Sequence, residues 1–119
     1  MAFPATYNIA YYQGDTYEFV LRPLDSTGNP FNLDGYTPAF KVAKVRGSNN
    51  IADYIGEGSS TPDVNAGTIT CEITALFGSN LVAGTNYVYD VAISKDGKEY
   101  TLVTGNISVT AQVIKVVPP

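Results

Sequence analysis

Four residues with oxygen-bearing side chains lie close together in one part of the chain and raise the question of a calcium site. They are Asp25, Asn29, Asn32 and Asp34, and carboxylate and amide oxygens are the ligands that Ca²⁺ prefers. Their spacing does not follow the D-x-[DN]-x-[DN]-G pattern of calcium loops. Asp and Asn are also favoured in turns, because their side chains hydrogen-bond the neighbouring backbone. We therefore interpret the segment as consecutive turns and predict no metal site, with a calcium loop as the alternative.

The other carboxylates and the single cysteine are poorly placed for catalysis. Asp15 and Glu18 would point to opposite faces of one strand, and Asp90 is expected on the outer face of another. Cys71 stands between two isoleucines of an alternating segment, which is typical of a buried structural thiol. The chain has no histidine, the residue that most often acts as a general base near neutral pH. We therefore predict that the protein is not an enzyme and uses no cofactor.

Composition limits the class of protein further. The 119 residues are enough for one domain with a single core. The formal net charge is −4 and the seven basic residues are scattered, so nucleic-acid binding through phosphate neutralisation is not expected. The sequence has no apolar run long enough for a membrane span, and its start lacks the pattern of a signal peptide. We expect a protein that is made in the cytoplasm without a signal peptide and is not inserted into a membrane.

Residues 84–107 predict a β-hairpin. The first half of this segment alternates apolar and less apolar residues, which is the period of a half-buried strand. Asp96-Gly97 follows, a pair favoured in two-residue type I′ turns. Such a short turn fixes the register of the two strands. The register predicted here pairs Ile93 with Tyr100, Val91 with Leu102, and Tyr89 with Thr104.

The second strand of this hairpin changes the parity of its apolar residues. They occupy even positions up to Leu102 and odd positions from Ile107 onward. Gly105 lies between them, and a glycine inside a strand often marks a bulge or a close approach of backbone. We predict a bulge or a change of sheet at Gly105. In that case Leu102 is buried and Val103 lies on the opposite face.

The rest of the chain also predicts short strands separated by turns. Alternation or flanking turn residues indicate strands at 6–12, 15–21, 39–45, 51–55 and 68–74. Their predicted inward residues are Tyr17, Phe19, Leu21, Phe40, Val42, Ile69, Cys71 and Ile73, with Leu33 as an anchor between turns. Residues 56–62 are predicted to be a loop, and Thr74 is predicted to cap one helical turn within 74–81. These elements indicate an all-β fold, an Ig-like antiparallel β-sandwich of about seven to eight strands with at most one short helical turn.

Both ends of the chain are apolar and tyrosine-bearing, although chain ends are usually polar. Residues 1–12 and 112–119 are either edge strands of a single domain spanning residues 1–119 or arms that dock on neighbouring subunits. Tyrosine suits interfaces, because its ring adds apolar area and its hydroxyl adds a hydrogen bond. Under the second interpretation the interface residues are Phe3, Tyr7, Tyr11, Tyr12, Ile114, Val116 and Val117.

The order of several short motifs resembles a known group of proteins. The motifs are Gly14-Asp-Thr-Tyr-Glu-Phe19, a D-x-x-G-x-P turn from Asp25 to Pro30, Leu33-Asp-Gly35, Tyr87-x-Tyr-Asp-Val91, Asp96-Gly-Lys98 and Thr101-Leu-x-x-Gly105. Tyr87 also resembles the corner tyrosine of Ig-like domains, with an ordinary tyrosine-rich strand as the alternative. The order is similar to that of small Ig-like β-sandwich proteins of tailed bacteriophages, including the N-terminal domain of phage baseplate upper proteins.

The resemblance implies a non-enzymatic structural protein of the virion. In this sequence no helix or coiled-coil segment follows the sandwich, so we expect first a capsid decoration, or cement, protein. The alternative is a baseplate or tail-fibre connector of the same fold. The implied partners are the major capsid protein or tail and baseplate proteins, in a homo-oligomer or symmetric multicopy assembly. A carbohydrate-binding module is a further alternative, against which the absence of tryptophan weighs.

Overall fold

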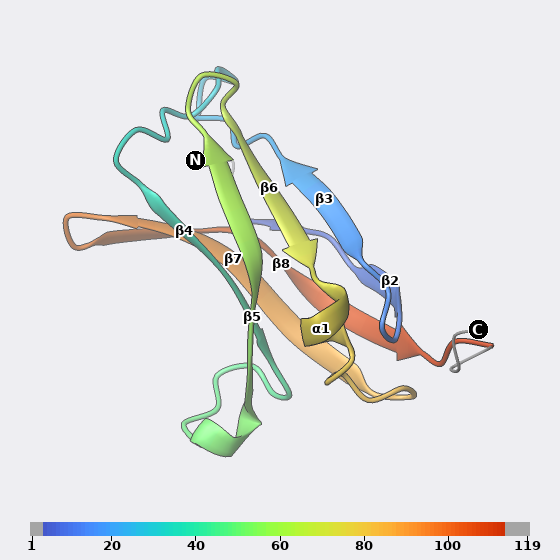
Figure 1. Ribbon diagram of the computed structural model, residues 1–119. Coiled ribbons are helices and arrows are strands. Elements are labelled where there is room, and N and C mark those ends of the chain that lie inside the picture. The colour runs from blue at the N-terminus through green and yellow to red at the C-terminus, as the bar shows by residue number, and fades with distance from the viewer. Residues whose placement is uncertain (1–3, 114–119) are drawn as a thin grey trace.

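Eight strands form one continuous sheet that curls until its two halves face each other in the computed structural model, which describes residues 4–113 (Figure 1). The strands are β1 (Ala5–Thr6), β2 (Ile9–Tyr12), β3 (Tyr17–Leu21), β4 (Thr37–Ala43), β5 (Tyr54–Asp63), β6 (Thr68–Ile73), β7 (Asn86–Lys95) and β8 (Lys98–Thr110). Two short helical segments accompany them, the 3₁₀ turn η1 (Ile51–Asp53) and α1 (Ala75–Gly78). The predicted all-β fold is confirmed, with one helical segment more than expected.

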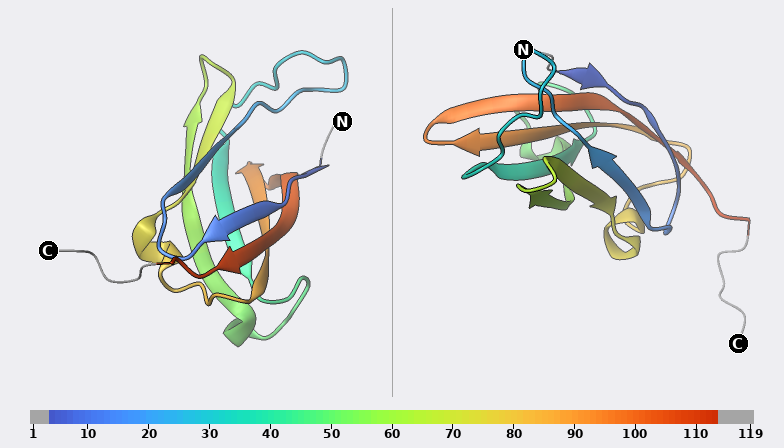
Figure 2. Two further views of the ribbon diagram at one scale, coloured as in Figure 1. Left: turned by 90° about the vertical axis from the view of Figure 1, so that its right-hand side faces the viewer. Right: turned by 90° about the horizontal axis from the view of Figure 1, so that it is seen from above.

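The strand order is β1-β8-β7-β4-β5-β6-β3, and β2 also pairs with β8. We call β1, β2, β8, β7, β4 and the first half of β5 the front sheet, and the second half of β5 with β6 and β3 the back sheet. Figure 2 shows the two layers from the side and from above. Strands β1 and β2 run parallel to β8, whereas the other pairs are antiparallel. The arrangement therefore departs from the purely antiparallel sandwich that was predicted.

Strand β5 joins the two sheets. Its first residues pair with β4 up to Gly58, and from Ser59 onward it pairs with β6. A Cβ on Gly58 would lie 2.6 Å from the ring of Phe40 and 2.8 Å from the carbonyl oxygen of Glu72, so the strand crosses the core where only glycine fits. The loop predicted for 56–62 and the separate edge strand predicted for 51–55 were wrong. Glycine and serine, which are common in loops, here allow one strand to bend between sheets.

The β7–β8 hairpin turns where the sequence predicted. Asp96 and Gly97 have φ values of 51° and 79°, as a type I′ turn requires, and Ile93 pairs with Tyr100. The register then shifts between Ala92 and Val91, so that Val91 pairs with Val103 and Tyr89 with Gly105. The two corresponding predicted pairs were wrong by one residue.

The bulge lies at Leu102 rather than at Gly105. Because Ala92 pairs with Thr101 and Val91 with Val103, Leu102 is the extra residue. Leu102 and Val103 are both buried, so the prediction for Val103 was wrong. Gly105 is needed for another reason: a Cβ there would lie 2.1 Å from the carbonyl oxygen of Tyr7. The N-terminal segment runs alongside β8 here, between β1 and β2, so the glycine marks a close approach of two backbones.

The core between the sheets is apolar and rich in aromatic rings. Every predicted inward residue of β3, β4 and β6 faces it, and the anchor Leu33 is buried. At its centre Phe19 and Phe40 pack edge to face, with ring centroids 5.5 Å apart, and Tyr89 lies 5.4 Å from Phe40. Such ring pairs add stability beyond the burial of area. Cys71 is fully buried among them, which confirms its structural assignment.

Two local predictions at the chain's turns are confirmed. The hydroxyl of Tyr87 accepts a 2.8 Å hydrogen bond from the backbone N–H of Val82, as a corner tyrosine does. The side chain of Thr74 accepts a hydrogen bond from the N–H of Phe77 and caps α1. Within residues 4–113, no helix is long and apolar enough to cross a lipid bilayer.

Candidate binding surfaces

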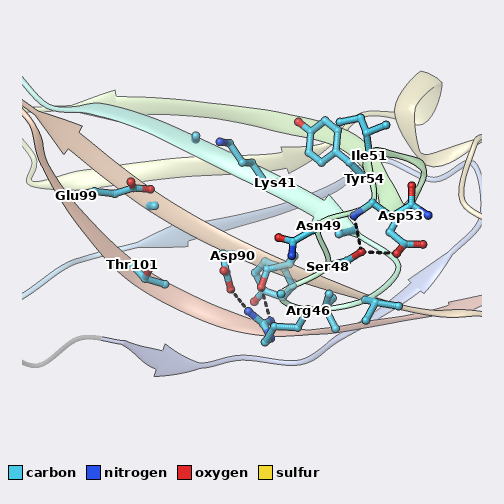
Figure 3. A pocket seen from close by; sticks show the side chains of 18 residues that line it. Lys41, Arg46, Ser48, Asn49, Ile51, Asp53, Tyr54, Asp90, Glu99 and Thr101 are labelled. Atoms are coloured by element: carbon cyan, nitrogen blue, oxygen red, sulfur yellow. Dashed lines mark hydrogen bonds and ion pairs between the residues drawn. The ribbon is translucent and has the colours of Figure 1, made fainter.

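The outer face of the front sheet carries a polar groove, which Figure 3 shows from close by. Its floor is made of small side chains, Ala39 and Ala43 from β4 and Ala92 from β7, and the segment between β4 and β5 folds over one side. The volume of the groove is about 420 Å³. Lys41, Tyr54 and Glu99 stand around it. We call this surface the polar groove.

Most charged groups of the polar groove are already paired within the protein. The guanidinium of Arg46 forms a 2.7 Å ion pair with Asp90 and also donates to the carbonyl oxygen of Tyr89 at 3.2 Å. The hydroxyl of Ser48 donates to the carboxylate of Asp53 at 2.5 Å. The Arg46 contacts hold the overhanging segment against β7, and the Ser48 bond lies within that segment. Asp90 is therefore a surface carboxylate with an ion-pair partner in the same chain, on the outer face where it was expected.

A second groove follows the open side of the molecule, where the edge of the front sheet faces the edge of the back sheet. We call it the edge groove; its volume is about 550 Å³, and its lining is mainly apolar. The lining residues come from β1, β3, the residues that directly follow each of these strands, and the bulged part of β8: Ala5, Tyr7, Phe19, Val20, Leu21, Arg22, Pro23, Leu24, Leu102 and Val103. Three of them are large exposed apolar side chains, Tyr7 at 41 %, Val20 at 42 % and Leu24 at 42 %. Arg22 supplies the one charged side chain in this lining.

Tyrosine hydroxyls tie the two sheets together beside the edge groove. The hydroxyls of Tyr7 and Tyr17 lie 2.5 Å apart, and the hydroxyl of Tyr89 donates to the carbonyl oxygen of Tyr7 at 2.5 Å. Burial, with the hydrogen bond to Tyr7, raises the pKa of Tyr17 to about 12. Burial also raises the pKa of Tyr89. The phenols of Tyr17 and Tyr89 are therefore neutral at ordinary pH. The Tyr7–Tyr17 contact joins β3 of the back sheet to the N-terminal segment of the front sheet, and the Tyr89 bond holds that segment in place.

The structure exposes some of the residues predicted to form an interface and buries another. Tyr7 and Tyr12 are exposed, with Tyr12 at 54 %. Tyr11 is only 1 % exposed, so its assignment to a docking surface is corrected: its ring belongs to the core. Its hydroxyl donates to the carbonyl oxygen of Asp15 at 2.6 Å, and a Cβ on Gly78 would collide with that hydroxyl. Phe3, Ile114, Val116 and Val117 lie outside the described residues.

The edge groove was not predicted from the sequence. Its walls come from β1, β3 and β8, which include segments far apart in the sequence. No local pattern of residues therefore indicates that these segments meet. One signal was present, because Val20 is an apolar residue on the outward side of an alternating strand. An outward valine has no core to pack against, and such a residue indicates a contact surface when other apolar side chains lie beside it.

The acidic turn segment satisfies its own polar groups. One carboxylate oxygen of Asp25 accepts hydrogen bonds from the hydroxyl and the N–H of Thr27 and from the N–H of Asn29. These bonds, first that from the Thr27 hydroxyl, lower the pKa of Asp25. Asn32 likewise accepts from the N–H of Asp34. Among residues 4–113, no group of three or more His, Cys, Asp or Glu side chains is arranged to hold a metal ion.

Comparisons with known proteins identify no family for this chain. No family model matches the chain, and no curated protein matches its sequence. Among solved structures, it is similar to part of the Yersinia pseudotuberculosis adhesin InvE, with a TM-score of 0.48 and 23% sequence identity. The match covers 87% of this chain and 24% of the adhesin chain, so this chain spans about a quarter of that protein. A likeness of this size carries no argument about function.

Proposed function

We propose that the protein is a non-enzymatic structural component of a tailed-phage virion and that it acts as a capsid decoration protein. The observation that carries the proposal is the exposure of apolar side chains along the open edges of the sandwich, at Tyr7, Tyr12, Val20 and Leu24. The order of sequence motifs that resembles Ig-like phage proteins supports the virion context. Its partners are other virion proteins, the major capsid protein first, and its location is the particle.

The proposed mechanism is burial of modest apolar areas on many symmetric copies. Each large apolar side chain contributes about 1.5–3 kcal/mol when fully buried, from which the cost of association must be subtracted. A few such side chains give a weak single contact. A shell presents the same contact many times, and linked contacts strengthen one another. A small domain with apolar edges suits this mode of binding.

A baseplate or tail-fibre connector is the second candidate function. It is favoured by the similarity to the N-terminal domain of baseplate upper proteins. A connector would use the same edges on a tail or baseplate protein, so the chemistry of contact does not separate the two roles. The number of copies in a particle does separate them.

Binding to particles tests the proposal directly. Purified protein is added to particles that lack it, and the bound fraction is measured after sedimentation. We expect Tyr12→Ser to weaken binding, because Tyr12 is the most exposed of the interface residues that the structure describes. Ser108→Ala, on the neighbouring strand and also exposed, is the matched control and should bind as the unchanged protein does. Absence of the protein from particles, or equal binding of both variants, would contradict the docking surface proposed here.

A further inference from the structure

The free edge of β3 carries a self-complementary charge pattern. β3 stands at the end of the strand order and pairs only with β6 among the described strands. Its inward residues are Tyr17, Phe19 and Leu21, so Glu18, Val20 and, by continuation, Arg22 lie on the outer side. An acid, an apolar residue and a base therefore alternate along an exposed edge strand.

Within one copy of the chain this pattern is left uncompensated. Glu18 pairs directly with Glu72 across the β3–β6 ladder, and like charges opposite each other destabilise a sheet. The one ion pair within residues 4–113 joins Arg46 to Asp90, so neither Glu18 nor Arg22 has a charged partner there. The carboxylates of Glu18 and Glu72 thus face each other at this edge. The guanidinium of Arg22, two residues beyond Val20, has no charged partner within residues 4–113.

We propose that the protein forms a two-fold symmetric dimer in which the β3 edges of two copies pair antiparallel about Val20. In that register Glu18 lies opposite Arg22 of the partner subunit, and Arg22 lies opposite the partner's Glu18. Val20 meets Val20 of the partner subunit at the axis. Two ion pairs thus flank one apolar contact, and each added guanidinium offsets the repulsion between Glu18 and Glu72.

The inner side of the same strand suits this pairing as well. There Phe19 lies opposite Leu21 of the partner subunit. Phe19, Leu21 and the exposed Val20 and Leu24 all line the edge groove, so the apolar groove is where the second strand would be placed. Paired edges also satisfy the backbone groups that an edge strand leaves open. Such an isologous contact is the commonest symmetry of protein dimers.

The dimer specifies a self-contact of the multicopy assembly proposed above but does not depend on the virion role. It is measured on the purified full-length protein by sedimentation velocity, from low micromolar to near-millimolar concentration. We expect a reversible monomer–dimer equilibrium. Arg22→Glu should weaken it by about tenfold or more, because two ion pairs become two like-charge contacts. Lys44→Glu, which makes the same charge change at an exposed residue away from β3, should leave the dimer constant unchanged.

Mixing of charge variants tests the register itself. Arg22→Glu gives copies with two acidic residues on the β3 edge, and Glu18→Arg gives copies with two basic ones. Each variant alone should dimerise about tenfold or more weakly than the wild type, and an equal mixture should form a heterodimer at wild-type strength. Circular dichroism on each variant shows that it is folded.

Three results would overturn the proposal. The first is a wild-type protein that stays monomeric throughout, which would leave the edge groove to a segment of another protein. The second is a dimer that Arg22→Glu does not weaken. The third is a mixture of the two variants that remains monomeric where the wild type dimerises.

Discussion

The hydroxyl of Tyr89 donates a 2.5 Å hydrogen bond to the carbonyl oxygen of Tyr7, across 82 residues of sequence. Tyr89 belongs to β7, inside the front sheet, and Tyr7 lies between β1 and β2, where the N-terminal segment runs alongside β8. The bond therefore fixes the path of the segment that lines the edge groove. Tyr7 in turn meets Tyr17 of β3 through its own hydroxyl.

Removal of the Tyr89 hydroxyl should destabilise the fold. Tyr89→Phe keeps the ring against Phe40 and leaves the Tyr7 carbonyl without this donor. An unsatisfied buried polar group costs about 1–3 kcal/mol of unfolding free energy. Urea unfolding followed by circular dichroism measures the difference. Tyr54→Phe, at a tyrosine that is 41% exposed, is the control and should change the unfolding free energy by less than about 0.5 kcal/mol. Equal effects of the two substitutions would contradict the role of the Tyr89 bond.

Gly105 should tolerate no side chain. Gly105→Ala places a Cβ 2.1 Å from the carbonyl oxygen of Tyr7, so the N-terminal segment beside β8 must move. We expect a loss of more than about 2 kcal/mol in unfolding free energy and a lower melting temperature. Ser59→Val, at an exposed strand position, should be nearly neutral. If the two variants melt at the same temperature, the N-terminal segment does not approach Gly105 as closely as described.

The bulge at Leu102 predicts that two consecutive residues support the core. Leu102→Ala should cost about 2–5 kcal/mol, the usual range for a buried leucine. Val103→Ala should also destabilise, by less, because fewer carbon atoms leave the core. In a hairpin without the bulge, Val103 would face outward and its truncation would be nearly neutral. Thermal unfolding of Leu102→Ala and Val103→Ala therefore distinguishes a bulged hairpin from a regular one.

Stability should fall at alkaline pH because several acidic groups, Cys71 and Tyr17 among them, have raised pKa values in the folded protein. Burial raises the pKa of Cys71 from its ordinary value of 9.0 to about 12, and the pKa of Tyr17 rises from 10.0 to about 12. A raised pKa means that folding favours the protonated form. The stabilising contribution is therefore complete below about pH 9 and is lost progressively as the pH rises toward 12. Urea midpoints measured across this range should decrease, and Tyr17→Phe should make the decrease less steep.

The Cys71 thiol should be unreactive in the folded protein. Its sulfur is fully buried, and its raised pKa leaves almost no thiolate at pH 8. Alkylation by iodoacetamide, followed by mass spectrometry, should proceed only in denaturant. Rapid labelling of the native protein would show that the back sheet opens readily.

Local patterns of residues predicted most strands and the turn at Asp96-Gly97, because alternation and turn chemistry act over a few residues. The position of the bulge was not predictable in this way. Leu102 and Val103 are both apolar, so the parity change could occur anywhere up to Ile107, and Gly105 was the most conspicuous residue between them. Strand β5 was missed because Gly58 allows close packing against Phe40 and Gly56 against Phe77. No neighbouring residue in the sequence reveals these contacts.

The candidate surfaces were less predictable than the fold. Tyr12 and Tyr7 were found because apolar residues near a chain end stand out, whereas the neighbouring Tyr11 was misassigned although its alternation with Ile9 indicated the core. The edge groove depends on β1, β3 and β8 meeting in space. Only the three-dimensional arrangement brings Arg22 and Val20 beside Leu102.

The number of copies per particle tests the central claim most directly. Virions are purified, and the chain is quantified by mass spectrometry against the major capsid protein with labelled peptide standards. A decoration protein is predicted to be present in hundreds of copies, in a fixed ratio to the capsid protein that follows shell symmetry. Tens of copies or fewer would place the protein in the tail or baseplate, and its absence from purified particles would contradict a structural role in the virion.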